Sequence, residues 1–290
     1  MKRYDFVYLF DVKDANPNGD PDAGNLPRVD PETGHGLVTD VCMKRKIRNY
    51  VGIKGGEKNR IYYTEGSVLN KTSKEAWESV GLKPDKKLPQ DAQKAKAITQ
   101  YMCDHFYDIR AFGAVMSNEV NCGQVRGPVQ ISFARSVEPI ISSEHTITVC
   151  AARKEDKPVE EQVGIQGRKF TVPYGLYRAQ GVVNPLLAEK TGFSEDDLKL
   201  LWEALAKAFE IDQSAARPAG SMSARMLIAF KHDSELGNAP AHKLFDLVRI
   251  TPVGESGKPA RSFSDYEKGI SVPPEGKLAE FPGVEVIHIF

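Results

Sequence analysis

Residues 4–12 read YDFVYLFDV, a run of aromatic and β-branched side chains with few polar positions. Such residues favour extended backbone, so the run predicts an opening strand that is largely buried. It is followed by NPNGDP at residues 16–21, in which every residue favours turns. The chain up to residue 36 stays rich in Pro, Gly and acidic residues. It predicts a long irregular loop, and such loops in a compact domain are usually functional or disordered.

A basic amphipathic helix is expected directly after this loop. Thr39 or Asp40 can cap it, and it would run over residues 41–51. At about 100° per residue, its apolar arc contains Met43, Ile47, Tyr50 and Val51. Another arc contains Lys44, Arg45 and Arg48. The pattern predicts a helix that packs on the opening strand with one face and presents a cationic stripe on another.

The remaining elements complete a split βαβ order. A capping-box pattern at residues 194–197 starts a second amphipathic helix. Further strands are predicted at 127–137, 146–152, 170–183, 225–231, 243–251 and 283–290. The charged residues 153–169 lie between two of these strands and predict a long projecting hairpin. The core order is strand, helix, strand, strand, helix, strand, which is that of an α+β, ferredoxin-like fold.

Composition excludes several classes of protein. The 290 residues include 39 Lys+Arg and 39 Asp+Glu, so the formal net charge is zero, and 41% are hydrophobic. These ordinary values exclude a disordered chain or a fibrous repeat, but they say nothing about local charged patches. No apolar run approaches the roughly 20 residues of a membrane helix. Four widely spaced cysteines without a C-x-x-C pair favour a reduced cytosolic protein. Sequence motifs of NTPases, dinucleotide enzymes and α/β-hydrolases are absent.

The cationic stripe is the first candidate binding surface. Residues 41–54 hold five Lys/Arg and no acid. Asp40 can pair with Lys44 one turn on, but Arg45 and Arg48 have no carboxylate at helical spacing. A polyanion would relieve the repulsion among these cations, because its phosphates release counterions on binding. The alternative is a solvated helix face that happens to be basic, and charge alone favours it.

Three further segments carry side chains that are candidates for metal binding, catalysis or nucleic-acid binding. Asp11, Asp14 and Asp20 suggest a Ca²⁺ or Mg²⁺ site, although their spacing is not that of an EF-hand and an ordinary turn is the alternative. Residues 101–108 combine a thiol, a carboxylate and an imidazole, but a helix end that leads into a loop explains them better. The hairpin tip at 161–169 could wedge between bases and hold phosphate, and a solvated hairpin is the alternative.

Several of these stretches resemble one family. DANPNGDP at residues 14–21 resembles the signature of the repeated backbone subunit of the type I-C CRISPR surveillance complex, known as Cascade. TDVCMKRKIR at 39–48 is similar to a basic helix of that family, and DIRAFG at 108–113 to its D-x-x-x-F-G segment. Residues 127–137 resemble the strand that follows. VGIQG at 163–167, leading into YGLYRA at 174–179, resembles the family's thumb and central strand, and the likeness extends from residue 1 to about 232.

The resemblance implies a modified ferredoxin-like, RNA-recognition-type palm with helical fingers and a protruding β-hairpin thumb. Carried onto this chain, the palm comprises residues 1–52, 108–150 and 173–232, the first of these with the opening strand, its loop and the basic helix. The fingers occupy 53–107 and the thumb 151–172. Residues 233–290 form a C-terminal extension of unassigned role.

The resemblance also implies a non-enzymatic, cytoplasmic protein without cofactor or metal. Copies polymerise head to tail along a guide RNA (crRNA), which pairs with target DNA, while other Cascade subunits cap the ends. The implied RNA-binding residues are Asn16, Asn18, Lys44, Arg45, Arg48, Arg126, Arg135, Val163, Ile165, Gln166, Arg168, Lys169 and Arg217. The aromatic stacking motif of RNA-recognition domains is missing, which predicts a grip on the guide's backbone.

Two other functions stay open at this stage. Some relatives in type III complexes cut RNA with an Asp in the loop after the first strand. Asp14, Asp20 or Asp22 could therefore serve a metal-dependent ribonuclease. A protein-interaction module whose charged hairpin binds another protein is the third reading.

Overall fold

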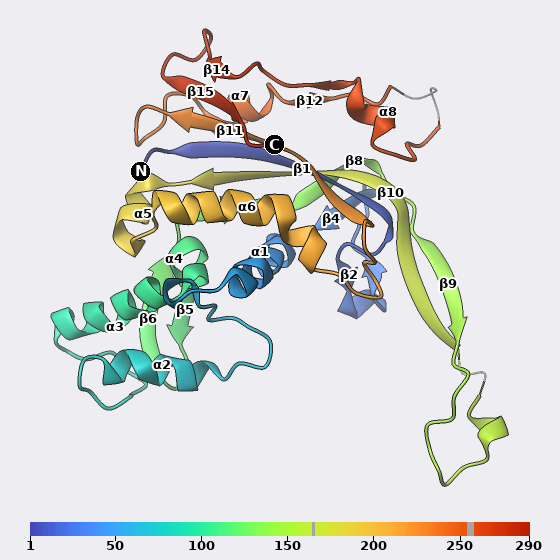
Figure 1. The fold of residues 1–290 in the computed structure, drawn as a ribbon, viewed down its shortest axis with the longest axis horizontal. Coiled ribbons are helices and arrows are strands. Elements are labelled where there is room, and N and C mark those ends of the chain that lie inside the picture. The colour runs from blue at the N-terminus through green and yellow to red at the C-terminus, as the bar shows by residue number, and fades with distance from the viewer. Residues whose placement is uncertain (164–165, 254–257) are drawn as a thin grey trace.

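The computed structural model describes residues 1–163, 166–253 and 258–290 (Figure 1). Within these residues nine strands form one antiparallel sheet, in the order β14-β15-β11-β1-β10-β8-β4, with β7 and β9 paired to β10. The strands are β1 (Tyr4–Ala15), β4 (His35–Val38), β7 (Val129–Ile131), β8 (Ala134–Pro139), β9 (Ser143–Thr148), β10 (Gln166–Val183), β11 (Met222–His232), β14 (Gly276–Lys277) and β15 (Val284–His288).

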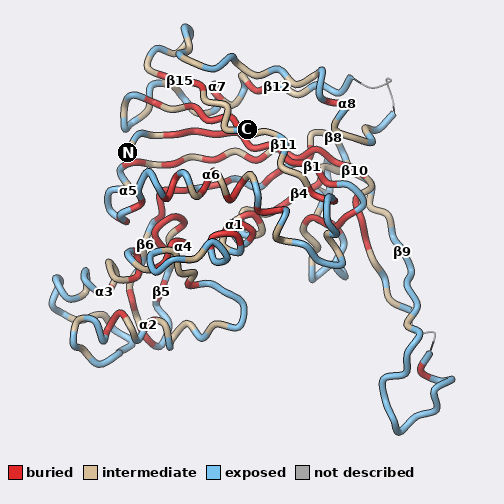
Figure 2. Tube along the Cα trace, in the orientation of Figure 1, coloured by how far each residue is buried: buried red, intermediate tan, exposed pale blue. Residues whose placement is uncertain are grey.

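Strand β1 lies at the centre of this sheet, between β10 and β11. Phe6, Tyr8 and Phe10 belong to the hydrophobic core on one face, and Val7 and Leu9 to the core on the other. Because successive side chains of a strand point to opposite faces, a strand covered on both sides must be apolar at nearly every position. The predicted largely buried opening strand is thus confirmed (Figure 2).

Helices α1 (Asp40–Lys54) and α6 (Glu195–Ile211) cover the first of these faces (Figure 1). The Thr39 side chain caps α1 by accepting from the Cys42 backbone N–H at 3.2 Å, and the apolar arc predicted for α1 is buried. The predicted capping box of α6 is present between Ser194 and Asp197. Trp202 of α6 meets the Phe6 ring edge-on, with centroids 5.2 Å apart, which locks the helix to β1.

The loop after β1 contains more regular structure than the irregular loop that was predicted. It holds the short pair β2 (Gly19–Asp20) and β3 (Leu26–Pro27), joined by the 3₁₀ turn η1 (Pro21–Ala23). The turn ends at Gly24, whose left-handed φ of 62° suits glycine. Local turn chemistry therefore gives this Pro-rich segment a defined shape.

A helical unit with its own core follows α1. It comprises η2 (Glu57–Asn59), α2 (Leu69–Glu78), α3 (Ala92–His105), α4 (Tyr107–Phe112), β5 (Gly113–Ser117) and β6 (Asn121–Arg126). Ile98 of α3 and Trp77 of α2 share a buried cluster with Met116 of β5, so the packing continues beyond residue 107 into the β5–β6 hairpin. The helix end predicted at 101–108 is present at His105, but no loop follows it, because only Phe106 separates α3 from α4.

Strands β9 and β10 form an arm that extends away from the body (Figure 1). The arm ends in an irregular tip that contains η3 (Val159–Glu161). The Gln162 side chain organises the tip: it accepts from the backbone N–H groups of Arg153 and Lys154 and donates to the Lys157 carbonyl at 2.8 Å. A strand was predicted at 146–152. β9 overlaps this range but starts and ends a few residues earlier.

The chain after β11 covers the second face of the sheet (Figure 1). It contains α7 (Ala241–Phe245), β12 (Arg249–Ile250), α8 (Ser264–Glu267) and β13 (Ile270–Ser271), as well as β14 and β15. The strand predicted at 243–251 was therefore wrong over its first half, where the chain is helical. Helix α5 (Pro185–Thr191) connects β10 to α6. In the described part of the chain, no helix is both long and apolar enough to span a membrane.

Candidate nucleic-acid interface

The cations of α1 have carboxylate partners. Lys44 pairs with Asp40 at 2.8 Å, as the helical spacing predicted. Arg45 and Arg48 have no carboxylate at helical spacing, as predicted, but each has a carboxylate partner from a distant segment. Arg48 Nε lies 2.9 Å from Asp108, which is 60 residues away in the sequence. Arg45 lies 4.0 Å from Asp212 of the α6–β11 loop.

Arg48 is a structural residue in this arrangement. Its side chain is only 13% exposed, and its guanidinium lies 5.3 Å from the centroid of the Phe112 ring. The fully buried Asp108 also accepts from the backbone N–H groups of Tyr62 and Tyr63, at 2.9 and 3.1 Å. One carboxylate thus joins α1, α4 and the start of the helical unit. Arg48 has little surface left to offer a ligand.

Arg45 presents the opposite case. Its side chain is 57% exposed and lies in a cluster around Asp212, which also contacts Lys46 and Arg217. Burial lowers the pKa of Lys46. Burial alone would raise the pKa of Asp212, but the three cations outweigh it and hold that pKa below its usual value. With Asp212 ionised, three basic side chains face one carboxylate, and positive charge is left over at the surface.

Three segments that are distant in sequence meet at this cluster. The Asn16 N–H donates to the Ala216 carbonyl at 3.0 Å, which joins the loop after β1 to the α6–β11 loop. The Asn18 side-chain oxygen accepts from the N–H of Thr39 at 2.9 Å and so joins the same loop to the start of α1. We call this junction the α1 surface: Asn16–Asn18, the N-terminal half of α1 and residues 212–221.

Asn16 and Asn18 have mainly structural roles at the α1 surface. Asn16 is buried and its side-chain N–H donates to the Asn25 carbonyl at 2.7 Å. Its side-chain oxygen is also buried and has no partner among the described residues. Asn18 holds the helix cap Thr39. The two residues therefore shape the loop that lies beside Arg45.

The α6–β11 loop was missed by sequence reasoning, which had singled out only Arg217. Its sequence, SAARPAGS at 214–221, contains Gly and Pro and indicates no more than a turn. Ser214 and Ala215 are exposed, and such small side chains let a ligand approach the backbone closely. Arg217 itself donates to Asp212 at 3.0 Å. Only the fold shows that this loop lies next to α1.

The other predicted residues do not gather at the α1 surface. Arg126 is exposed at the end of β6 and has no ion pair within the described ranges. Arg135 lies on β8 directly opposite Arg178 of β10, and so on the sheet face away from α1. It pairs there with Asp30 at 2.5 Å.

The predicted tip residues belong to the projecting arm. Val163 is exposed, Gln166 begins β10, and Arg168 pairs with Glu144 across the arm at 3.2 Å. Lys169 is half-buried and lies opposite His145 in the ladder. Ile165 falls outside the described residues. The arm is thus separate from the α1 surface in this single chain (Figure 1).

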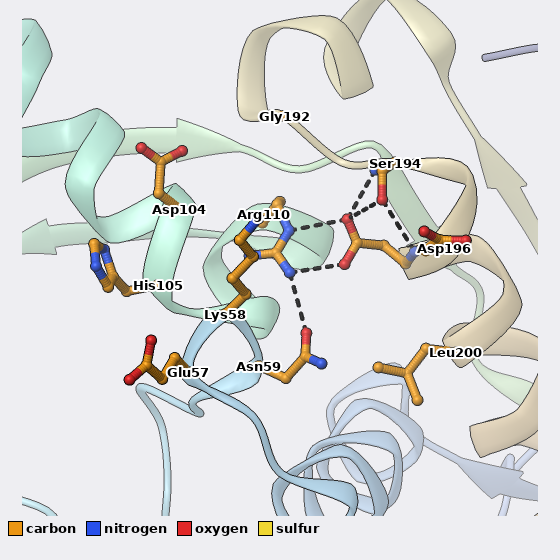
Figure 3. Close-up of a pocket in the computed structure, with 11 residues that line it drawn as sticks. Glu57, Lys58, Asn59, Asp104, His105, Arg110, Gly192, Ser194, Asp196 and Leu200 are labelled. Atoms are coloured by element: carbon orange, nitrogen blue, oxygen red, sulfur yellow. Dashed lines mark hydrogen bonds and ion pairs between the residues drawn. The ribbon is translucent and has the colours of Figure 1, made fainter.

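A cavity of about 640 Å³ lies between η2, α3 and the start of α6 (Figure 3). Arg110 spans it and makes two bonds to Asp197, at 3.0 and 2.7 Å, and one to Asn59 at 3.3 Å. Its donors are therefore used inside the protein. The remaining charged lining is mostly acidic: Glu57, Asp104 and Asp196. The Arg110–Asp197 pair in this cavity links the helical unit to α6. The acidic side chains around it would repel a polyanion.

The acidic residues considered as metal ligands lie apart. Asp11 is buried and accepts from the Tyr174 hydroxyl and from Arg225, at 3.1 and 2.9 Å. Asp20 caps η1 and lies 3.5 Å from Arg28. His105 of the 101–108 segment bonds its own helix at the Tyr101 carbonyl. Within the residues that the structure describes, no group of three His, Cys, Asp or Glu side chains is placed to hold a metal ion.

The fold and the α1 surface define an α+β protein with a large antiparallel sheet and a cationic junction beside its first helix. A family model described as CRISPR-associated protein Cas7 matches residues 2–271, and the chain belongs to this family. The CRISPR-associated protein Cas7 of Haloferax volcanii is 26% identical over 313 residues, which span 100% of this chain and 86% of that protein.

A solved structure extends the likeness to the fold. It is a chain of a "CRISPR RNA-guided surveillance complex, pre-nicking" and covers 80% of this chain and 79% of its own length. The TM-score is 0.52 and the sequence identity 16%, so the two chains are similar in fold alone.

Proposed function

We propose that this Cas7-family chain is a non-catalytic, guide-RNA-binding backbone subunit of a type I-C surveillance complex. Family membership supports the general role, and the motifs at residues 14–21 and 39–48 support the subtype. The core strand order β11-β1-β10-β8, with α1 and α6 on one face, is compatible with a ferredoxin-like palm. In this proposal residues 53–107 are the fingers and the β9–β10 arm is the thumb.

The observation that carries the proposal is the excess of positive charge at the α1 surface. The side chain of Arg45 is 57% exposed, whereas that of Arg217 is 17% exposed, and Asp212 is their single shared carboxylate. A phosphodiester chain laid across this junction would gain two or more ionic contacts and release counterions. Since these contacts are to phosphate, the bases stay free to pair with target DNA, and pairing alone supplies sequence specificity.

Assembly completes the proposal. Head-to-tail copies would bind successive stretches of one guide, with other subunits at the ends. Arg126, Arg168 and Lys169 would then add phosphate contacts from the helical unit and the arm.

The test measures RNA affinity across a salt series. We expect the double variant Arg45→Ala/Arg217→Ala to bind single-stranded RNA more weakly than the parent. The slope of log K against log salt should become shallower by about 1.4, since each lost phosphate contact removes about 0.7. Fluorescence anisotropy with a labelled RNA provides the measurement. Asp212 keeps its contact with Lys46 in this variant, so we expect the fold to survive.

The matched control is Lys190→Ala/Lys199→Ala, which removes two exposed cations outside the α1 surface. It should leave affinity and slope at parental values. Identical binding by the parent and the Arg45/Arg217 variant would reject the α1 surface as the RNA interface. Incubation of the same RNA with Mg²⁺ or Mn²⁺ tests the non-catalytic role, because turnover abolished by Asp20→Ala would establish a ribonuclease.

A further inference from the structure

A second polar recess lies on the sheet face that is turned away from α1. It has a volume of about 540 Å³ and is bordered by β4, β8, β10 and the C-terminal segment at Ile250. Arg135 and Arg178 are direct cross-strand partners, so both guanidinium groups lie on this face. The size of the recess is within the usual range of small-ligand sites.

The guanidinium group of Arg178 forms the floor of the recess and is held in a fixed position. Arg178 donates to the Val248 and Phe245 carbonyls, at 3.0 and 2.6 Å, which holds its guanidinium in place. Its Nε is buried and has no hydrogen-bond partner among the described residues. Burial lowers the pKa of Arg178, yet the group stays charged because the ordinary pKa of an arginine lies far above neutral pH. A nearby anion would therefore be stabilised.

Other polar groups at the recess are available for a ligand. His35 uses Nδ1 on the Ser136 carbonyl at 2.7 Å, which leaves Nε2 without a partner among the described residues. The Gln180 side-chain amide likewise makes no hydrogen bond within the described ranges, and it can both donate and accept. Arg135 donates one hydrogen bond to Asp30, and its side chain remains 51% exposed. None of the described residues that line the recess is an acid.

An exposed aromatic ring completes the recess. The predicted continuous strand at 127–137 is interrupted between β7 and β8, at Ser132 and Phe133. Ser132 bonds back to Gln180 at this break, and Phe133 is left 52% exposed. A large aromatic ring that remains open to water beside guanidinium and amide groups is the usual combination at single-stranded nucleic-acid sites, where a base stacks and a phosphate is held.

We propose that this recess binds one unpaired nucleotide of a single-stranded nucleic acid. The base stacks on Phe133 and bonds to the Gln180 amide, while its phosphate lies against Arg135 and His35. This site goes beyond the proposed function, which places the guide on the opposite face at the α1 surface. A strand held here is thus a second strand, or a part of the first strand that has passed around the β4 edge.

The test uses labelled oligothymidylate and oligouridylate with the full chain. We expect Phe133→Ala to weaken binding of at least one of them by about fivefold or more, the range of one lost base–aromatic stack. Phe133→Tyr should retain binding, because it keeps the ring. Ile141→Ala is the matched control: Ile141 follows β8 and is also apolar and exposed, and its loss should change nothing.

Photo-crosslinking identifies the site directly. An oligonucleotide carrying 4-thiothymidine should crosslink to the tryptic peptide 127–135 in the parent, and this product should be lost in Phe133→Ala. The Arg45→Ala/Arg217→Ala variant should keep the crosslink, so the result can be read even if the proposed guide interface fails. Equal binding by the parent and Phe133→Ala, or crosslinks confined to the α1 surface, would overturn the proposal.

Discussion

Two carboxylates decide which cations of α1 can reach a ligand. The buried Asp108 accepts hydrogen bonds from Arg48 and from two backbone N–H groups. This ion pair holds the Arg48 guanidinium inside the protein. Asp212 is shared among three cations and cannot neutralise them all. A weaker RNA interaction in an Arg48 variant would therefore reflect a damaged fold as much as a lost contact. Arg45, whose side chain is 57% exposed, is the residue of this cluster on which to judge binding.

At this scale we predict that Asp108→Ala strongly destabilises the protein. The change leaves the Arg48 guanidinium buried without its partner, which costs about 3 kcal/mol or more of unfolding free energy. Urea unfolding followed by circular dichroism provides the measurement. The control Asp196→Ala breaks an exposed pair with Lys199 and should cost no more than about 1 kcal/mol. Comparable losses in the two variants would show that the Arg48–Asp108 pair contributes little.

Between elements, Glu203 of α6 joins the two helices on the first sheet face. It accepts from the Tyr50 hydroxyl at 2.7 Å and from Lys54 at 2.9 Å, both on α1, and from Lys207 of its own helix at 3.2 Å. The hydrogen bond from Lys54, followed by that from Tyr50, lowers the pKa of Glu203 from 4.5 to about 2. Burial raises the pKa of Tyr50 to about 12, so its hydroxyl remains a donor at neutral pH.

This contact predicts a pH dependence of stability. Because the folded-state pKa of Glu203 lies below the unfolded value, its contribution is complete above about pH 5 and disappears as the pH falls towards about 2. Glu203→Gln should therefore be less stable than the parent at neutral pH, and the difference should vanish near pH 2. Thermal unfolding of both proteins across this range provides the measurement. A difference that stays constant with pH would contradict the assignment.

In the whole molecule, the sheet is a layer between two covers. Helices α1 and α6 protect one face, and the chain after β11 protects Val7, Leu9 and Phe230 on the other. The C-terminal extension, whose role the sequence left open, is therefore required to bury the second face. It also pairs β15 with β11, which would otherwise be the edge of the sheet.

Truncation after His232 should consequently yield an insoluble or aggregated protein. Removal of residues 233–290 uncovers the apolar second face and leaves β11 as an unpaired edge, and both features promote association. Soluble yield and size-exclusion chromatography provide the measurement. As a control, replacement of the arm tip at 151–162 by a short glycine linker should leave a soluble protein, because residues 151–161 are exposed and the side-chain bonds of Gln162 stay within the tip. A soluble, monodisperse truncated chain would refute the layer argument.

Local pattern in the sequence was enough to determine the buried strand β1, the apolar arc of α1 and the capped start of α6. Each depends on residues within one or two turns of each other, whose periodicity shows directly which face is buried. The motifs at 14–21 and 39–48 likewise indicated the Cas7 family. The ion-pair partners of Arg45 and Arg48 could not be identified in this way, because they come from distant segments that meet only in the fold. For the same reason, only the tertiary structure could place Arg135 on the face opposite α1, fold the C-terminal extension over the sheet, and bring residues 212–221 beside the first helix.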